Sequence, residues 1–279
     1  MLEIDLASYF DSIDRGKLLE LLQRRVADGT ILQLVGKCMH VGVLDGEEYS
    51  RPEVGTAQGS TLSPLLGNIY LHYVLDLWFT EEVKPRLAGK AMLCRYADDA
   101  VFGFERQDDA ERVKRVLEKR LARFGLKLNH DKTRLLDFRN PRWTPNSERR
   151  RGTFDYLGFT WYWRRTRRGS WMVACKTRRT RQTRIIRSVY DWCRGHRYLS
   201  IGEQYATLAR RVQGHYNYFG VNGNVRSLQA VLHAVERVWF KWLNRRSQRA
   251  SLTWQRFQDL LRDYPLPAPR VIVDIWSTR

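Results

Sequence analysis

The stretch "LCRYADDAVFGF" at residues 93–104 constrains the fold more than any other part of the chain. It places two adjacent carboxylates, Asp98 and Asp99, between two short apolar runs that have the pattern of strands around a tight turn. Two neighbouring carboxylates near a core repel each other and lose hydration, so they need a cation or hydrogen bonds to hold them. Arg95 is the one base within the stretch. The sequence therefore predicts a strand hairpin whose turn binds a positively charged partner.

The charge of the chain is divided unevenly along its length. The formal net charge is +19 over 279 residues. Residues 1–140 hold 21 Lys and Arg against 22 Asp and Glu, whereas residues 141–279 hold 28 against 8. A surplus of that size repels itself unless a counter-charge is bound. A near-neutral first part is thus joined to a strongly basic second part, which indicates a polyanionic partner such as nucleic acid.

Cysteine spacing and hydropathy narrow the class of protein further. Cys38, Cys94, Cys175 and Cys193 are scattered and show no spacing typical of a zinc site. We expect reduced thiols in a cytoplasmic protein. The sequence has no secretory signal pattern and no apolar run long enough to span a bilayer, so we expect no membrane partner.

Hydrophobic periodicity predicts strands and helices in the first part and mostly helices in the second. Leu2, Ile4 and Leu6 alternate with acidic residues, as in a half-buried strand with Asp5 on its polar face. Ser63 is expected to cap a long helix that runs to Leu77. Residues 126–138 read as two strands around a turn at 129–131. Other helices are predicted over 15–27, 31–39, 108–124, 185–193, 205–219, 225–243 and 254–261. One hairpin is predicted with its turn at 44–48, and another over 153–176 with a basic tip at 164–170.

If the first strand lies beside the hairpin at 93–104, three carboxylates meet at one place. Asp5, Asp98 and Asp99 would then offer hard oxygen ligands, which suit Mg²⁺ or Mn²⁺. Such ions keep part of their hydration and take further ligands from a substrate triphosphate. On this interpretation the partner of the doubled carboxylate is metal.

The order of motifs resembles the palm of reverse transcriptases, most closely the proteins encoded within bacterial group II introns. The motifs are "DLASYFDSID", "GTAQGSTLSPLLGNIYL", "YADD", "LKLNHDKTR" and "FDYLGF". In the basic part, "RVQGHYNYFG", "FKWLNRRSQR" and "LTWQRF" look like the maturase, or thumb, domain of that family. The resemblance implies an α+β fold: an antiparallel palm sheet backed by helices at 1–165, and a basic, mostly helical thumb and maturase domain at 166–279.

The resemblance also implies roles for single residues in catalysis. Asp5 and Asp98 would be the principal ligands of two metal ions, assisted by the Leu6 carbonyl and by Asp99. Lys132 would lie near the leaving phosphates as a general acid. The four catalytic candidates are therefore Asp5, Asp98, Asp99 and Lys132.

Other roles concern the nucleotide, the primer and the RNA. Phe10 would stack under the incoming sugar and exclude a 2′-hydroxyl, and Gln58 and Lys132 would line the same dNTP pocket. Tyr156, Leu157 and Gly158 would grip the primer end. The RNA-binding candidates are Arg178, Arg179, Arg181, Arg184, Arg245 and Arg246.

Each of these roles has a plainer alternative. Phe10 would be a core aromatic in most proteins, and Lys132 a solvated charge. Trp239 is expected to pack between helices rather than to stack on a base, and Asp14 is expected to cap a helix. His215 and Tyr216 also read as core residues.

The resemblance implies an RNA-directed DNA polymerase with maturase activity in splicing and mobility, in the bacterial cytoplasm. Its partners would be intron RNA, an RNA template, a DNA primer and dNTPs with two Mg²⁺ or Mn²⁺ ions, and homodimers occur in the family. Ala57 and Ser60 depart from the family's usual Pro and Gly, and the fingers region expected before Asp5 is missing from the sequence. Two alternatives stay open: a non-enzymatic RNA-binding splicing factor, and a reverse transcriptase of another bacterial retroelement or defence lineage.

Overall fold

The computed structural model describes residues 1–39, 43–45, 48–50, 55, 61–143, 152–246 and 251–276. The chain separates into two compact units. The first comprises Met1–Arg139 and Asn146–Leu157, and the second comprises Asn140–Pro145 and Gly158–Arg279. Each unit has a hydrophobic core of its own.

The first unit is built on a four-stranded sheet with the order β4-β5-β1-β6. Its strands are β1 (Leu2–Ile4), β4 (Ala91–Tyr96), β5 (Asp99–Phe104) and β6 (Arg134–Leu135). All three pairings are antiparallel. β1 therefore lies in the middle of the sheet, next to the hairpin made by β4 and β5, as the sequence predicts.

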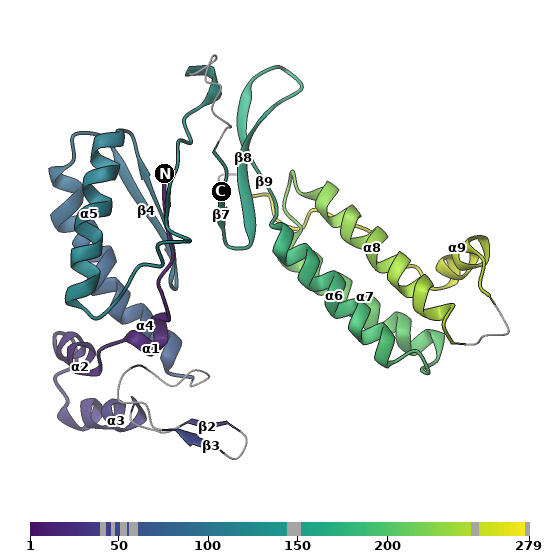
Figure 1. Cartoon of the computed structure of the whole chain (residues 1–279), viewed down its shortest axis with the longest axis horizontal. Coiled ribbons are helices and arrows are strands. Elements are labelled where there is room, and N and C mark those ends of the chain that lie inside the picture. The colour runs from purple at the N-terminus through teal and green to yellow at the C-terminus, as the bar shows by residue number, and fades with distance from the viewer. Residues whose placement is uncertain are drawn as a thin grey trace. The chain divides into compact units, whose positions relative to one another are not determined.

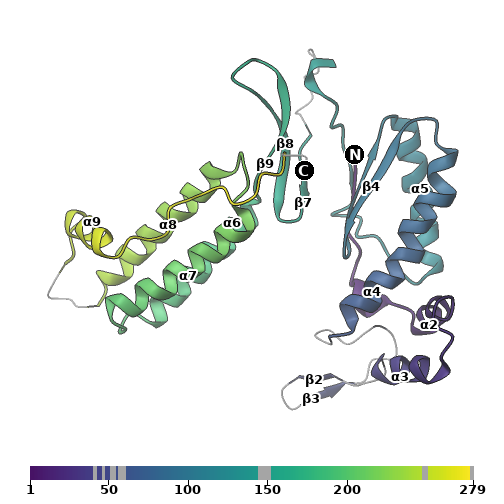
Figure 2. The same ribbon diagram turned by 180° about the vertical axis from the view of Figure 1, so that it is seen from behind.

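Helices cover one face of this sheet. Leu2, Ile4 and Phe102 point from that face into the core. The helical segments of the unit are α1 (Tyr9–Ser12), α2 (Arg15–Gln23), α3 (Gly29–Met39), α4 (Ser63–Leu71), η1 (His72–Val83), η2 (Lys84–Arg86) and α5 (Gln107–Arg123). Figure 1 shows α5 running alongside β4, and the view from behind shows the same arrangement (Figure 2). The unit is thus an antiparallel sheet backed by helices.

The long helix after residue 60 differs from its prediction at both ends. Ser63 is the first residue of α4 rather than its cap, Leu62 takes the cap position, and Pro64 follows within the first turn, where its missing N–H is tolerated. α4 continues without a break into η1, a π-helical segment that ends at Val83. Both segments contribute buried side chains to the core, among them Tyr70, Val74 and Trp78.

The segment at 126–138 corrects the predicted hairpin. Leu128 forms an isolated antiparallel bridge with Leu6, and β6 pairs with Leu2 and Glu3. The two extended pieces therefore both align with β1 rather than with each other. The alternation of apolar residues is real, but the partner strand is distant in the sequence, so local pattern could not identify it.

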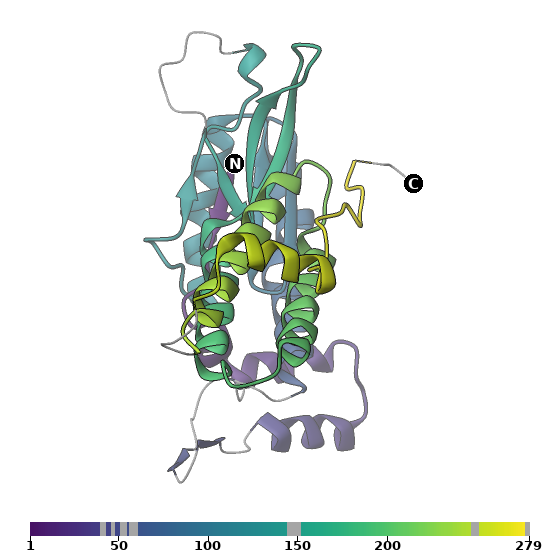
Figure 3. The same cartoon turned by 90° about the vertical axis from the view of Figure 1, so that its right-hand side faces the viewer.

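The second unit combines a hairpin with a bundle of helices. β8 (Phe159–Arg165) and β9 (Trp171–Thr177) pair antiparallel around the basic tip that the sequence predicts. α6 (Arg179–Gly195), α7 (Ile201–Phe219) and α8 (Val225–Leu243) follow, then α9 (Trp254–Asp263). The contacts among α6, α7 and α8 place these three helices side by side, and Figure 3 shows the yellow α9 crossing in front of them. The remaining described elements of the chain are β2 (Val43–Asp45), β3 (Glu48–Ser50), η3 (Pro141–Trp143) and β7 (Phe154–Tyr156).

The core of the second unit uses the aromatic residues that the sequence offered as either packing or base-stacking groups. Trp239, Tyr216 and Phe257 are fully buried. His215 is also buried, and burial lowers the pKa of its imidazole. These side chains therefore pack in the core, which is the simpler of the two interpretations. Near the C-terminus, Val273 forms a parallel bridge with Val221 in place of a further strand.

Candidate active site

The turn between β4 and β5 carries the doubled carboxylate. Tyr96 pairs with Asp99, so Ala97 and Asp98 form the two-residue turn. Ala97 adopts a φ of 52°, in the left-handed region that only glycine enters without cost. Asp98 is half-buried and Asp99 is exposed. The backbone conformation at Ala97 therefore determines where both carboxylates are presented.

Asp5 lies beside this turn because of the strand register. The last pair between β1 and β5 is Ile4 with Ala100, so Asp5 and Asp99 are the next facing positions. Directly opposed residues in antiparallel strands point to the same face. Ile4 and Ala100 are buried on the helical face, so Asp5 and Asp99 belong to the opposite face. The predicted approach of the first strand to the hairpin is confirmed at the level of the backbone.

The Leu6 carbonyl is directed toward the same end of the sheet. The bridge between Leu6 and Leu128 is formed by hydrogen bonds from Asn129 N to Asp5 O, 2.8 Å, and from Ala7 N to Lys127 O, 2.9 Å. In such a pair the central residues turn their own N–H and C=O groups outward, away from the partner strand. The carbonyl of Leu6 therefore points to the β5 side, where Asp98 lies next in register.

The carboxylates themselves do not form a cluster of three. Across the described ranges, no group of three His, Cys, Asp or Glu side chains is close enough together to hold a metal ion. The Asp5 carboxylate instead accepts a hydrogen bond from the Lys132 ammonium, 3.3 Å between Oδ2 and Nζ. The structure thus brings two predicted catalytic residues, Asp5 and Lys132, into contact, and the strand register makes Asp5 and Asp99 facing positions.

The donor set nevertheless has the chemistry of a divalent-ion site. Three carboxylates and one outward-facing carbonyl are hard oxygen ligands, the kind that Mg²⁺ and Mn²⁺ prefer. Lys132 occupies the position of a cation next to Asp5, and it is 66 % exposed, so solvent reaches this end of the sheet. The residues present therefore fit a divalent ion, although their side chains would have to move toward it.

The predicted sugar-stacking residue lies on α1 and packs against α4. Phe10 is partly buried against the core of the first unit, with its ring centroid 5.1 Å from that of Tyr9. A side-chain carbon at Gly67 would lie 3.1 Å from both rings, which is tighter than most van der Waals contacts, so glycine favours this close approach of α4. Gln58, predicted in the same pocket, lies outside the described residues. Phe10 thus has a fixed position next to the strand that ends before Asp5.

The predicted primer-gripping residues lie at the end of β7. Tyr156 Oη accepts a hydrogen bond from Cys94 Sγ of β4 at 3.4 Å. Burial and this contact with Cys94 raise the pKa of the Tyr156 phenol, and Asp99 contributes to the same shift. Leu157 and Gly158 follow with φ values of 51° and 77°. The first unit thus places Tyr156 on the sheet face that carries Asp99.

Backbone strain coincides with the predicted motifs. Among the described residues, three that are not glycine have positive φ: Ser8 at 44°, Ala97 at 52° and Leu157 at 51°. Ser8 lies between Asp5 and Phe10, Ala97 begins the carboxylate turn, and Leu157 follows Tyr156. Such conformations persist where the surrounding structure enforces them, and they cluster at functional sites. This is an argument for a site here that does not depend on any motif.

The RNA-binding candidates occupy two ends of helices in the second unit. Arg178 is the N-cap of α6, and Arg179, Arg181 and Arg184 follow on its first turns, all exposed. A helix N-terminus attracts anions through its free N–H groups and its dipole. Arg245 lies over the Trp242 ring, 5.6 Å from its centroid, and Arg246 donates to the Leu199 carbonyl. The structure brings the first four together and leaves the last two at the far end of α8.

Two residues close to the site were not identified from the sequence. Asp76 of η1 and Asn68 of α4 both bind the Arg95 side chain. An available signal was the charge of Asp76 within the apolar run "YVLDLWF", since a carboxylate there needs a partner.

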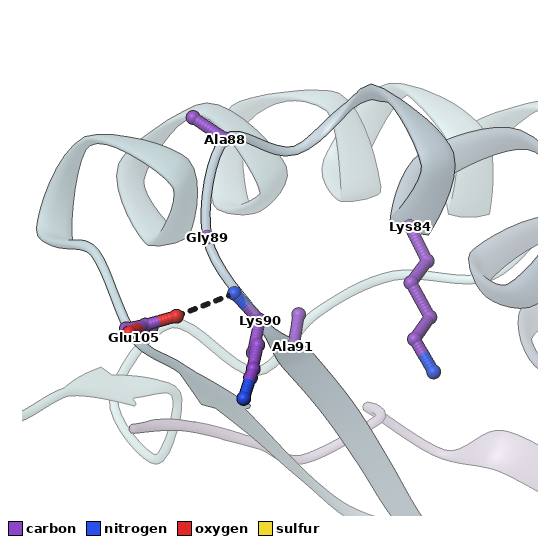
Figure 4. A pocket seen from close by; sticks show the side chains of 6 residues that line it. All are labelled: Lys84, Ala88, Gly89, Lys90, Ala91 and Glu105. Atoms are coloured by element: carbon purple, nitrogen blue, oxygen red, sulfur yellow. Dashed lines mark hydrogen bonds between the residues drawn. The ribbon is translucent and has the colours of Figure 1, made fainter.

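A separate hollow lies at the far end of β4. It has a volume of about 560 Å³ and is lined by Lys84, Ala88, Gly89, Lys90, Ala91 and Glu105. Figure 4 shows the Glu105 carboxylate accepting a hydrogen bond from the backbone N–H of Lys90. None of the predicted catalytic residues lines this hollow, so it is distinct from the carboxylate turn.

Comparison with known proteins supports the first unit most directly. The profile of a family described as "Reverse transcriptase (RNA-dependent DNA polymerase)" matches residues 1–161. The group II intron-encoded protein LtrA of Lactococcus lactis is 41 % identical over 79 residues, which are 27 % of this chain and 13 % of LtrA. An uncharacterised 91 kDa protein in the cob intron of Schizosaccharomyces pombe is 38 % identical over 94 residues, 34 % of this chain and 11 % of that protein.

A third relative gives the longest of these three alignments. Protein YkfC of Escherichia coli is 32 % identical over 165 residues, 48 % of this chain and 42 % of YkfC. The chain thus spans less than half the length of each of these curated relatives. In the described residues, no helix has the length and apolar character needed to cross a membrane.

Proposed function

The chain belongs to the reverse transcriptase family, and from this premise we propose that it is an RNA-directed DNA polymerase of a group II intron. The observation that carries the proposal is the strand register that makes Asp5 and Asp99 facing positions, beside the strained turn at Ala97. The lineage is supported by the names of two relatives, a group II intron-encoded protein and a protein in a cob intron. The same register would not be needed for RNA binding alone.

In this proposal Asp5, Asp98, Asp99 and the Leu6 carbonyl hold two Mg²⁺ ions. When bound, such ions activate the primer 3′-hydroxyl and neutralise the leaving pyrophosphate. Lys132, which pairs with Asp5, would hold a proton near the leaving phosphates. Phe10 stacks under the sugar and leaves no room for a 2′-hydroxyl.

The remaining roles divide between the palm and the thumb. Gln58 lines the nucleotide pocket, and residues 156–158 position the primer. The palm function is assigned to residues 1–165 and the maturase function to 166–279, where the arginines at the start of α6 hold phosphates of intron RNA, with a contribution from Arg245 and Arg246. The chain would act in the bacterial cytoplasm on an RNA template and a DNA primer, and dimer formation is part of the same proposal.

Primer extension tests the polymerase. The native chain is expected to extend a DNA primer on an RNA template with Mg²⁺ and dNTPs, and Asp98→Ala is expected to abolish extension because it removes a principal ligand. Asp108→Ala, which removes an exposed carboxylate from the first turn of α5, is the matched control and should extend normally. Extension that Asp98→Ala leaves intact, or no extension by the native chain, would reject the polymerase.

A second function has an observation in its favour. The Asp5–Lys132 ion pair, and the absence of a three-carboxylate cluster in the described parts of the chain, suit an RNA-binding splicing factor that keeps the palm as a scaffold. Such a protein would promote intron splicing equally well with Asp98→Ala. A splicing assay run beside primer extension therefore separates the two functions, and neither result depends on the other.

A further inference from the structure

The guanidinium of Arg95 lies under the turn that carries Asp98 and Asp99. Arg95 is next to the end of β4, in register with Ala100. Its Nη1 donates a hydrogen bond to the carbonyl oxygen of Ala97 at 2.8 Å. Ala97 is the residue with positive φ, so this bond acts on the backbone unit whose conformation sets the direction of both carboxylates.

Two other elements fix the same guanidinium. Asp76 of η1 accepts a bidentate pair of bonds, from Nε at 2.7 Å and from Nη2 at 2.5 Å. Asn68 of α4 accepts a further bond from Nη1 at 3.0 Å. The Arg95 side chain is only 12 % exposed, and its hydrogen bond with Asp76 raises the pKa of the guanidinium. The Ala97 carbonyl is thus tied through one planar group to two helical segments of the core.

Arg95 does not supply the counter-charge for the doubled carboxylate. Ala100, its register partner, is buried on the helical face of the sheet, whereas Asp99 belongs to the opposite face. The Arg95 charge is matched by Asp76 instead.

A lysine could not make the same set of contacts. Arg95 uses Nε, Nη1 and Nη2 toward acceptors on three different segments. The guanidinium offers these donors in a rigid plane, whereas an ammonium is a single point on a flexible stem. A bidentate Arg–Asp pair also fixes the orientation of the donor plane, which an ammonium would leave free.

We propose that Arg95, oriented by Asp76, is a positioning residue that holds the Ala97 turn in the conformation that presents Asp98 and Asp99 to divalent metal. This inference rests on the proposed polymerase function and identifies a residue that orients the turn at its metal site. It acts through the Ala97 carbonyl, without contact with the metal or the nucleotide.

The test compares two bidentate Arg–Asp pairs in the same unit. Arg95→Lys and Asp76→Asn alter the pair below the turn, whereas Arg106→Lys and Asp108→Asn alter an exposed pair with the same geometry at the start of α5. Two quantities are measured on the full chain: single-nucleotide incorporation, and Mn²⁺ binding by electron paramagnetic resonance without nucleic acid. Thermal unfolding of each variant shows that it is folded.

Arg95→Lys and Asp76→Asn are each expected to lower kcat by about 10- to 100-fold, because small misplacements of reacting groups have effects of that size. The KM for dNTP should change little, Mn²⁺ binding should weaken, and added metal should restore part of the rate. The Arg106 and Asp108 variants should stay within about twofold of the native chain. If Arg95→Lys fails to fold, Asp76→Asn gives the same comparison, since it keeps the size of the side chain.

Three results would overturn the proposal. Native kcat and native Mn²⁺ binding in a folded Arg95→Lys or Asp76→Asn variant would do so. Equal losses of kcat in the Arg95→Lys and Arg106→Lys variants would also overturn it. A lower kcat in Arg95→Lys with unchanged Mn²⁺ binding would do the same. Because the native chain and Asp98→Ala are run in parallel, failure of the polymerase itself is seen separately, as no extension by the native chain.

Discussion

At the scale of single residues, hydrogen bonds from neighbours outside the proposed ligand set hold the backbone around the carboxylates. Arg95 binds the carbonyl of Ala97, Tyr9 donates to the carbonyl of Gly67 at 2.5 Å, and Thr133 Oγ1 accepts from the amide of Asp5 at 3.5 Å. The contacts of Tyr9 and Thr133 join segments far apart in the sequence, and Arg95 is itself held by Asp76 of η1. A carboxylate could be found from its neighbours in the sequence, but its supporting contacts could not.

Asp14 gives a residue-scale prediction about stability. Its side chain accepts a hydrogen bond from the amide of Lys17 at 3.0 Å and caps α2, as the sequence predicts. Asp14→Ala should lower the free energy of unfolding by about 1 kcal/mol at neutral pH, because the cap is lost. Asp14→Asn should retain most of the stabilisation from the cap, since an amide oxygen accepts the same hydrogen bond. Urea denaturation at pH 7 measures both changes.

The pH dependence of this cap has a defined sign. The hydrogen bond from the Lys17 amide lowers the pKa of Asp14 below its ordinary value of 3.8. The charged carboxylate therefore contributes stability above that pH, and the contribution is lost as pH falls through the folded-state pKa. The difference in the free energy of unfolding between the native chain and Asp14→Asn should be constant above pH 3.8 and shrink below it. If this difference in free energy grew as the pH fell, the charged Asp14 carboxylate would not stabilise the start of α2.

At the scale of elements, the two units are held by different kinds of contact. The first unit depends on strand pairing between β1 and β5, which are separated by most of that unit. The second depends on packing among α6, α7 and α8, which follow one another along the chain. The local sequence pattern therefore predicted the helices of the second unit well. In the first unit it predicted where the strands lie better than which strands pair with each other.

A buried hydrogen bond joins α7 to α8 and supplies an element-scale prediction. The indole N–H of Trp239 donates to Gln204 Oε1 at 2.9 Å, and Gln204 Nε2 donates to the carbonyls of His196 and Leu199. Both side chains are buried. Gln204→Ala should lower the free energy of unfolding of this unit by roughly 2–4 kcal/mol, since it leaves buried polar groups unpaired and a cavity behind.

The control for Gln204 lies on the same helix. Gln213 of α7 donates to Asn217 at 2.8 Å in an exposed position. Gln213→Ala should change the free energy of unfolding by less than about 0.5 kcal/mol. Urea unfolding followed by tryptophan fluorescence compares the two variants, and equal effects would show that the buried bond does not stabilise the bundle.

At the scale of the whole molecule, the uneven charge predicts a salt-dependent interaction with RNA. Affinity for a polyanion falls with salt according to the number of phosphates neutralised. Replacing Arg178, Arg179, Arg181 and Arg184 by Gln should weaken binding to a labelled single-stranded RNA oligonucleotide. The slope of log affinity against log salt should decrease by about one for each arginine that contacts phosphate.

A matched control separates local contact from total charge. Replacing Arg112, Lys114, Arg115 and Lys119 on α5 by Gln removes the same formal charge from the first unit. This variant should keep the native slope in a fluorescence anisotropy titration over a range of salt. Equal slopes in both variants would assign the binding to net charge and not to the start of α6.

The pattern of neighbouring residues was enough to predict the elements whose pattern is local. The hairpin at 91–104, the helices of the basic part and the cap at Asp14 all depend on residues a few positions apart, and the candidate carboxylates were identified with them. Only the tertiary structure decided that residues 126–135 align with β1, that Lys132 binds Asp5, and that Arg95 faces Asp76 rather than the doubled carboxylate. These contacts depend on strand register and on which face of the sheet each side chain occupies. Both follow from burial of the core across long sequence separations, which the pattern of neighbouring residues does not encode.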